Sequence, residues 1–227
     1  MIRVLYEDNH IIAAIKPRSM PVQADSSGDE DMLRHLKAYI KEKYKKPGEV
    51  YLGLVHRLDR PVGGVMVFAR TSKAAKRLSE QFALQKPVKR YAAVVHGGKE
   101  GGRLVGWILK DGKANKVSVF ASERPGAKRA ELEYTKLESV NGLSLLDVNL
   151  FTGRPHQIRA QLADAGMEIY GDMKYGGREK GNIALWSYML EIEHPTLKKS
   201  MRFAEPPPDE YPWNIFTWPA SFNAGHE

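Results

Sequence analysis

The chain has 227 residues, a formal net charge of +8 and no cysteine. Its length suits one good-sized domain or two small ones, and the lack of cysteine excludes disulfides, thiolate metal sites and cysteine nucleophiles. No apolar run approaches the roughly 18 residues that a membrane span needs. Residues 1–8 lack the layout of a signal peptide, so we expect a cytoplasmic protein. The positive charge favours a polyanionic partner, of which nucleic acid is the commonest.

Alternating apolar residues and turn-forming residues predict the elements of the first part of the chain. These elements are strands at 3–6, 10–15 and 65–69, and helices at about 29–44 and 72–86. Thr71 and Ser72 are suited to cap the second of these helices. The first helix carries several lysines on its polar face, and such a face is either solvated or in contact with phosphates.

The later part of the chain is richer in strand patterns. Strands are expected at 88–95, 116–120, 130–134, 143–150, 183–192 and 200–203, with hairpins across 97–130. A helix is expected to begin at Pro155, with Thr152 or Gly153 as its cap, and to stop at Gly166.

These elements predict an α+β fold with a mixed, largely antiparallel sheet and flanking helices. We expect a single domain over residues 1–227, with its core at about 4–205. The tail, 206–227, is too rich in proline for regular structure. Its aromatic residues Trp213, Phe216 and Trp218 are expected to pack back on the body of the protein.

The most informative segment is Val55-His56-Arg57-Leu58-Asp59-Arg60. It places one carboxylate among basic side chains, just before a turn that contains glycine. Nearby cations favour the ionised form of a carboxylate, so Asp59 is suited to act as a nucleophile or base. A surface salt-bridge cluster is the alternative for such a segment taken alone.

Four ordered blocks accompany this aspartate: His56-Arg57-Leu58-Asp59, Lys89-Arg90-Tyr91-Ala92-Ala93, Thr152-Gly153-Arg154-Pro155-His156-Gln157-Ile158-Arg159 and Gly171-Asp172-Met173-Lys174-Tyr175-Gly176. Together they resemble the RluA family of pseudouridine synthases, whose blocks read H-R-L-D, K-x-Y-x-A, T-G-R-x-H-Q-x-R and G-D-x-x-Y-G. The resemblance extends to Glu7-Asp8 and Lys16-Pro17 and covers residues 4 to about 205.

The resemblance implies a reaction and a partner. Uridine in ribosomal or transfer RNA is isomerised to pseudouridine when the uracil is detached at nitrogen and rejoined through carbon. The family needs no metal or other cofactor, and its RNA binds in a central cleft. Many members carry a further N-terminal RNA-binding domain, whereas this sequence begins at the catalytic domain. We expect a monomer.

Three catalytic roles are implied by the same resemblance. Asp59 matches the catalytic aspartate, which acts as nucleophile on the ribose or the uracil, or as base at the ribose. Arg159 matches the arginine that pairs with it, since a guanidinium keeps a carboxylate ionised and oriented. Tyr91 matches the tyrosine whose ring can stack on the flipped uracil.

Four residues are expected to contact RNA. Arg57 matches the arginine that replaces the extruded base in the stack, and Arg60 and Arg154 are suited to contact phosphate. His156 either holds the Asp59 loop by a hydrogen bond or is purely structural. For Arg57 the alternative is a phosphate clamp or a plain surface charge.

Leu185 and Leu190 match apolar residues near the family's pocket, where a dry wall protects a cleaved glycosidic bond; core packing is the simpler role for both. The seven histidines show no metal-ligand spacing, so no metal site is predicted. The chain departs from the family at Pro61-Val62-Gly63, which replaces the usual Thr-Ser-bearing loop, and at Trp186-Ser187. These changes affect the hydrogen bonding of the loop and the rim of the pocket.

Two rival functions remain from other classes. A non-catalytic RNA-binding protein or RNA chaperone would gain nothing from Asp59, because a carboxylate repels phosphates. A glycosidase commonly needs a second carboxylate as acid, and within the matching blocks only Asp172 is available for that role.

Overall fold

The computed structural model describes residues 2–112 and 114–222. In it the chain forms two compact units. Unit 1 holds residues 2–87, 189–205 and 221–222, and unit 2 holds residues 88–188 and 206–220. The expectation of a single domain stays a prediction.

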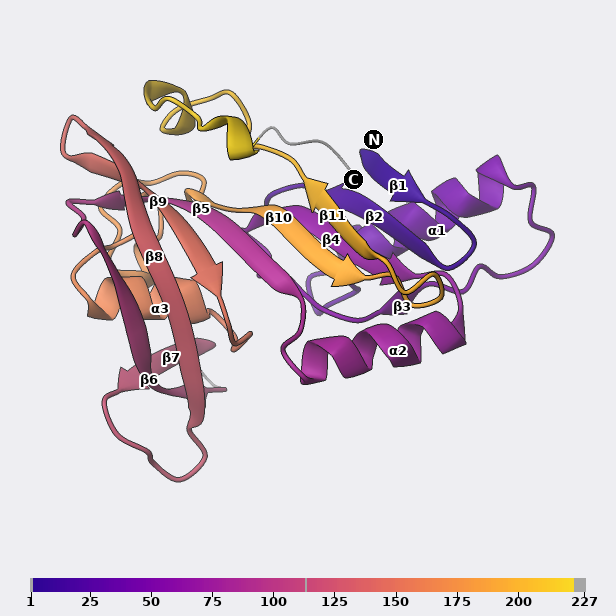
Figure 1. Ribbon diagram of the computed structural model, residues 1–227, viewed down its shortest axis with the longest axis horizontal. Coiled ribbons are helices and arrows are strands. Elements are labelled where there is room, and N and C mark those ends of the chain that lie inside the picture. Colours follow the sequence, from indigo (N-terminus) through magenta and orange to yellow (C-terminus); the bar gives the residue numbers. More distant parts are fainter. Residues whose placement is uncertain (1, 113, 223–227) are drawn as a thin grey trace. The chain divides into compact units, whose positions relative to one another are not determined.

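Unit 1 is built on antiparallel pairs of strands (Figure 1). Its strands are β1 (Val4–Glu7), β2 (Ile11–Lys16), β3 (Gly53–Leu54), β4 (Gly63–Ala69), the end of β10 (Leu185–Glu193) and β11 (Ser200–Ala204). The order is β1-β2-β4-β10, with β3 paired to β4 and β11 paired to β10. Neighbours β2 and β4 are buried on both faces, and they read as continuous apolar runs.

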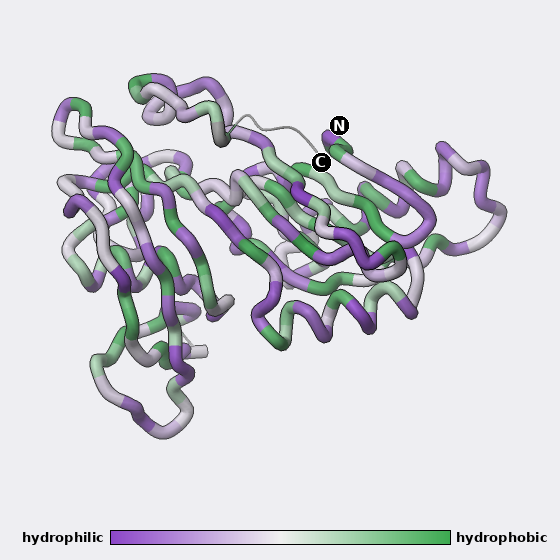
Figure 2. Tube along the Cα trace, viewed as in Figure 1, coloured by the Kyte–Doolittle hydropathy of each residue, from purple (hydrophilic) through white to green (hydrophobic). Residues whose placement is uncertain are grey.

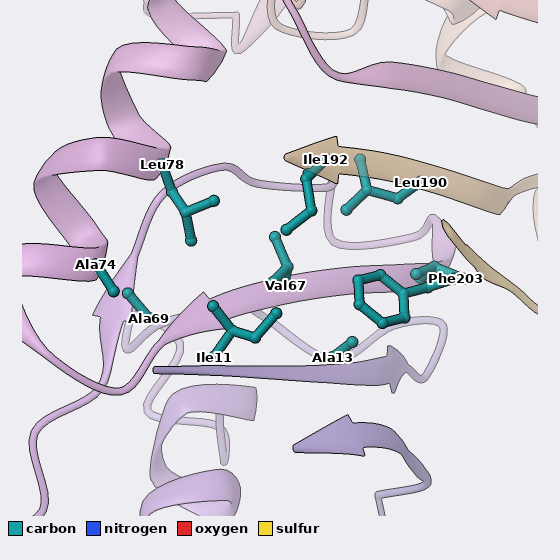
Figure 3. Close-up of a cluster of buried hydrophobic side chains, with 10 residues drawn as sticks. Ile11, Ala13, Val67, Ala69, Ala74, Leu78, Leu190, Ile192 and Phe203 are labelled. Carbon is teal, nitrogen blue, oxygen red and sulfur yellow. The ribbon is translucent and has the colours of Figure 1, made fainter. Parts of the chain in front are cut away.

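The core of unit 1 lies where alternate residues of these strands face helix α2 (Ser72–Ala83). Ile11 and Val67 meet Leu78 of α2 and Phe203 of β11 in a cluster that Figure 3 shows in close-up. Leu78, Phe203, Ile11 and Val67 are each fully buried. Burial of this kind contributes roughly 1.5–3 kcal/mol for each large apolar side chain, so the cluster fixes α2 on the sheet.

Both helices of unit 1 begin at side-chain caps. The Asp31 carboxylate accepts from the Arg34 amide at the start of α1 (Met32–Lys43), and the Thr71 hydroxyl accepts from the Ala74 amide at the start of α2. Hydrophilic and hydrophobic residues alternate along both helices, as the tube in Figure 2 shows. The hydrogen bond from the Ala74 amide to the Thr71 hydroxyl confirms the cap predicted at Thr71.

Unit 2 contains the longer strands. They are β5 (Val88–His96), β6 (Gly101–Asp111), β7 (Lys116–Phe120), β8 (Lys128–Val140), β9 (Leu143–Leu150) and the start of β10, in the order β10-β5-β9-β8-β6-β7. Helix α3 (Gln157–Asp164) packs its Ala160 on Ile108, Val117 and Ala130 of this sheet. A 3₁₀ turn, η1 (Met173–Tyr175), follows α3.

All the predicted strands are present, with three differences. β8 runs to Val140, beyond the predicted end at 134; the short strand β3 was not predicted; and β6 is a full strand inside the region expected to form hairpins. The prediction for the start of α3 is wrong. The helix begins at Gln157, and the cap position is His156 with a φ of 50°, rather than Thr152 or Gly153. Its end agrees with the prediction, since Gly166 follows the last turn with a φ of +75°.

Residues 206–220 of the tail belong to unit 2, and the aromatic side chains there pack back on the protein as expected. Trp213 and Phe216 are buried and Trp218 is half-buried, with the two tryptophan rings 5.9 Å apart. The Glu138 carboxylate of β8 accepts a hydrogen bond from the Thr217 amide. Over residues 206–222, the described part of the tail, the structure has two 3₁₀ turns, Trp213–Ile215 and Ala220–Phe222, and no other regular structure. Within the described residues, no helix has the length and apolar character to cross a membrane.

Candidate functional site

Asp59 lies on a turn that leads into β4. The Val62 amide donates to the Asp59 carbonyl at 3.0 Å and closes this turn. Leu58 and Val62 are buried on either side of it, while Asp59 is half-buried and Arg57 is exposed. The two apolar anchors therefore fix the backbone, and the carboxylate and the guanidinium stay within reach of a partner in solution.

The amine of Lys16 holds the backbone around Asp59. Lys16 ends β2 and is fully buried, and its Nζ donates to the carbonyls of Pro17, Arg60 and Val62 at 3.0, 2.9 and 2.8 Å. Burial lowers the pKa of Lys16 to about 7, against the opposing pull of the Asp59 carboxylate. A single side chain thus fixes two residues that follow Asp59 in the turn.

The His56 side chain also anchors the Asp59 segment, through contacts with β4 and α2. Its Nε2 accepts from the Val67 amide at 3.0 Å, and its ring stacks on Phe82 of α2 with centroids 4.6 Å apart. An Nε2 that accepts a backbone hydrogen bond is unprotonated. His56 is therefore a structural link between the Asp59 segment, β4 and α2, rather than one of the cations beside Asp59.

Arg60 has partners in the loop before α1. Its guanidinium pairs with Asp29, lies 3.5 Å from the Asp25 carboxylate and donates to the Ser27 hydroxyl at 3.0 Å. Its side chain remains 42% exposed, so a phosphate could reach it. Because the guanidinium is already paired with two carboxylates, that phosphate would have to compete with them. Arg57, by contrast, has no hydrogen bond or ion pair to another residue of the described chain.

Tyr91 lies on β5 in unit 2 and is only 8% exposed. Its neighbour Arg90 points to the opposite face of the strand, where the guanidinium pairs with Asp147 and reaches the Tyr188 hydroxyl at 3.4 Å. Burial, with the Asp147 charge, raises the pKa of Tyr188 to about 12. This network fixes β5 against β9 and β10, and so sets the position of Tyr91.

Arg159 forms a buried ion pair with Asp172. Its Nε and Nη2 atoms donate to the two carboxylate oxygens at 2.7 and 2.8 Å, and both residues are buried. Such a bidentate pair fixes the guanidinium plane. Both oxygens of Asp172 are engaged by this cation, which makes the residue a poor second acid for a glycosidase. The expected pairing of Arg159 with Asp59 stays a prediction.

Tyr175 connects the two blocks around this ion pair. The Arg159 guanidinium lies 5.1 Å from the centre of its ring, and its hydroxyl lies 2.9 Å from Nδ1 of His156 and accepts from the Val117 amide at 2.9 Å. His156 is thereby held by Tyr175 within unit 2. The turn just before Asp172 requires glycine at position 171, because a Cβ there would lie 2.4 Å from the Asn182 carbonyl oxygen.

A second basic group surrounds the half-buried Arg154. Its Nε donates to the Arg129 carbonyl at 2.9 Å, and its charge adds to burial in lowering the pKa of Lys89 to about 8. Arg103 and Arg129 both pair with the buried Glu131 and remain more than half exposed. Cations outnumber carboxylates here, as a surface that contacts phosphate requires.

Leu185 is 3% and Leu190 1% exposed. Leu190 lies in the core cluster of unit 1 with Val67 and Ile192 (Figure 3), so its side chain is used for packing. Leu185 is buried at the start of β10. Nothing in these positions distinguishes a pocket wall from core, and the assignment of both residues to a pocket stays a prediction.

The sequence missed three contributors to this arrangement: Lys16, Asp172 as the partner of Arg159, and Tyr175. Their positions in blocks shared with the family were the available indication. Among the residues that the structure describes, no group of three histidine, aspartate or glutamate side chains is placed to hold a metal ion.

The fold is that of pseudouridine synthases. The structure of human RNA Pseudouridylate Synthase Domain Containing 4 superposes with a TM-score of 0.77, covers 91% of this chain and 88% of its own, and is 22% identical. Human RNA Pseudouridylate Synthase Domain Containing 1 superposes with a TM-score of 0.71 at 20% identity, over 92% of this chain and 84% of its own. The predicted α+β fold class is confirmed.

Sequence comparison then gives the family. The sequence profile of RNA pseudouridylate synthase matches residues 10–164. A Helicobacter pylori protein named as an uncharacterized RNA pseudouridine synthase is 31% identical over 218 residues, which cover 90% of this chain and 66% of that protein. Ribosomal large subunit pseudouridine synthase D of Vibrio cholerae is 30% identical over 92% of this chain and 68% of its own. The chain therefore belongs to the RNA pseudouridylate synthase family, whose members are isomerases that act on RNA.

Proposed function

We propose that this synthase isomerises specific uridines to pseudouridine in structured ribosomal RNA, with Asp59 as the catalytic group. The observation that carries the proposal is the built turn around Asp59: a half-buried carboxylate between buried apolar anchors, with its backbone fixed by a buried lysine. A surface salt bridge needs no such support. The name of the Vibrio cholerae relative favours large-subunit ribosomal RNA over transfer RNA as the substrate.

In the proposed reaction Asp59 acts on a uridine that has been flipped out of its stack. An ionised carboxylate is required whether it attacks the ribose or the uracil, or removes a proton from the ribose. In each route the bond between ribose C1′ and uracil N1 breaks and a bond between C1′ and uracil C5 forms. C5 loses a proton and N1 gains one, so the isomerisation needs no other substrate.

Tyr91 and Arg159 are proposed to act on the same nucleotide, as the family blocks imply. The Tyr91 ring offers a stacking surface for the uracil, and Arg90, Asp147 and Tyr188 hold its strand. Arg159 is proposed to keep the Asp59 carboxylate ionised and oriented. Its own plane is fixed by Asp172, so it presents its remaining donors in a defined direction.

The exposed arginines are proposed to bind the RNA. Arg57 has no ion-pair partner in the described chain and lies two residues from Asp59, which suits it to fill the space left by the extruded base. Arg154 is proposed to contact phosphate together with its basic neighbours. Arg60 is proposed to contact phosphate only when a phosphate displaces the carboxylates of Asp25 and Asp29 from its guanidinium. His156 is proposed to support the RNA-binding surface indirectly, through its contact with the Tyr175 hydroxyl.

The experiment is in vitro modification of a large-subunit ribosomal RNA transcript by the purified protein, with pseudouridine mapped at single-nucleotide resolution. Asp59→Asn should abolish product formation while it leaves RNA affinity within a few-fold of wild type. Asp164→Asn, the same change at an exposed carboxylate, is the control and should remain active. Appreciable product with Asp59→Asn would remove Asp59 from its role.

The rival function is that of an RNA chaperone on the same fold. If the wild type anneals or unfolds RNA but forms no pseudouridine in any ribosomal or transfer RNA, the chaperone function would replace the enzymatic one. We further propose that the protein acts as a monomer in the cytoplasm and requires no cofactor. Sedimentation of the purified protein and assays in the presence of a chelator test these points.

A further inference from the structure

We propose that a groove beside α1 in unit 1 binds the phosphate backbone of RNA at nucleotides other than the reacting uridine. This inference rests on the proposed function only in taking RNA as the partner. The groove has a volume of about 600 Å³ and lies between α1 and residues 23–24 and 49–50. None of the residues that line it belongs to the Asp59 turn.

Three cations of α1 line this groove: Arg34, Lys37 and Lys41. Their spacing of three and four residues places them along one side of the helix. From the first to the last they extend over about 10 Å of the helix axis at 1.5 Å per residue. That length is comparable with a few consecutive phosphates at roughly 3.4 Å of axis per strand position. The row therefore suits a short stretch of nucleic acid backbone better than a single small anion.

The three cations differ in their partners from two basic residues near α1, Lys43 and Arg60. Lys43 on the same helix pairs with Glu7, and Arg60 pairs with Asp29. The side chains of Arg34, Lys37 and Lys41 form no hydrogen bond or ion pair with any residue between 2 and 112 or between 114 and 222. Like charges three and four residues apart disfavour a helix by a few tenths of a kcal/mol per pair. A bound polyanion would relieve that repulsion.

Two carboxylates also line the groove, and both are compatible with RNA. Asp31 is buried and its Oδ1 caps α1 by accepting from the Arg34 amide at 3.0 Å, so its charge is directed at the helix end. Glu49 is exposed. A carboxylate at the edge of a cationic groove can accept a hydrogen bond from a ribose 2′-hydroxyl, which only RNA offers.

The test compares two triple variants that lower the net charge equally. In the groove variant Arg34, Lys37 and Lys41 are replaced by glutamine. In the control variant the same replacement is made at the exposed Lys73, Lys76 and Lys86, which lie on or just beyond α2 and are not among the residues that line the groove. Binding to a large-subunit ribosomal RNA transcript is measured by fluorescence anisotropy across a series of salt concentrations.

The groove variant should bind about tenfold or more weakly at moderate salt. Its plot of log affinity against log salt should be shallower by about two to three, because each lost phosphate contact removes roughly 0.7–0.9 from the slope. The control variant should stay within about twofold of wild type. A further variant that keeps the charges, with Arg34→Lys, Lys37→Arg and Lys41→Arg, should bind as the wild type does, which separates charge from folding.

Equal losses in the groove and control variants would overturn the proposal, because they would show an effect of net charge alone. Wild-type affinity in the groove variant would also overturn it. Failure of the proposed function has a different appearance: the wild type would form no pseudouridine, while the two triple variants would still differ in RNA binding.

Discussion

Replacement of Lys16 by methionine tests whether a buried amine positions the catalytic turn. Methionine has a similar length and fits an apolar site, but it cannot donate to the carbonyls of Pro17, Arg60 and Val62. An intramolecular hydrogen bond contributes about 0.5–1.5 kcal/mol, so the loss of these bonds removes on the order of 3 kcal/mol of restraint from the turn. A displacement of about 1 Å at a reacting group costs about 100-fold in rate. We therefore expect kcat to fall by about two orders of magnitude.

The pH dependence of stability gives a second readout of the same amine. The pKa of Lys16 is 10.5 in its ordinary state and about 7 when buried. Between these values the unfolded chain binds a proton that the folded protein does not, so the free energy of unfolding rises with pH across this window and falls as the pH drops toward 7. Lys16→Met removes that contribution. The difference between wild type and variant should change by about 2–3 kcal/mol, in favour of the wild type, from about pH 7.5 to about pH 9.5.

Single-turnover assays and urea unfolding at several pH values measure the two effects. Lys73→Met, at an exposed position of α2, is the matched control and should change neither kcat nor the pH slope. Wild-type kcat in Lys16→Met, together with a stability difference that does not depend on pH, would refute the role of Lys16 as a positioning residue for Asp59.

Three further predictions concern unit 2. Asp172→Ala leaves the buried Arg159 guanidinium without its carboxylate and should lower the free energy of unfolding by about 3–5 kcal/mol; an equally stable variant in urea unfolding would argue against the buried pair. Gly171→Ala should cost about 1–3 kcal/mol or more, because φ is +77° and the Cβ would meet a carbonyl oxygen; wild-type thermal stability would contradict this. Tyr91→Phe should retain RNA affinity and some activity, because its ring can still stack on the uracil. Tyr91→Ala should lose activity by about 100-fold or more, because it removes the surface that positions the uracil. Similar rates in the two variants would exclude stacking as the role of Tyr91.

Much of the fold follows from local sequence patterns. β2 and β4 are continuous apolar runs, and such runs predict strands that are buried on both faces. α1 and α2 follow from apolar residues at helical spacing, and Thr71 is a good cap because its hydroxyl can reach the Ala74 amide. These features depend on residues close in sequence, so the sequence alone predicts them.

The start of α3 could not be predicted in the same way. Proline favours the first turn of a helix, but here the chain is held by contacts with β8. The Thr152 hydroxyl accepts from the Glu131 amide and donates to the Gln157 side chain, at 2.8 and 2.7 Å. The Gln157 amide group in turn donates to the Glu131 carbonyl. These long-range bonds delay the helix until Gln157, and no local pattern records them.

In the candidate site, too, the sequence predicts the residues carried by motifs but not the long-range contacts that hold them. Asp59, Tyr91 and Arg159 were predicted from motifs, and the structure shows how each is supported. The support itself was not predictable. Lys16 at a strand end is typical of an exposed lysine, yet its amine reaches carbonyls 44 and 46 residues further along the chain. The partner of Arg159 within unit 2 is Asp172, 13 residues away, and neither residue indicates the other by composition.

The most direct test of the central claim is pseudouridine mapping across total RNA from cells with and without this gene. We predict at least one ribosomal uridine that loses its modification on deletion. Wild-type protein should restore the modification, and Asp59→Asn should not. Restoration by Asp59→Asn, or an unchanged map after deletion, would contradict the claim that this chain is a synthase that depends on Asp59.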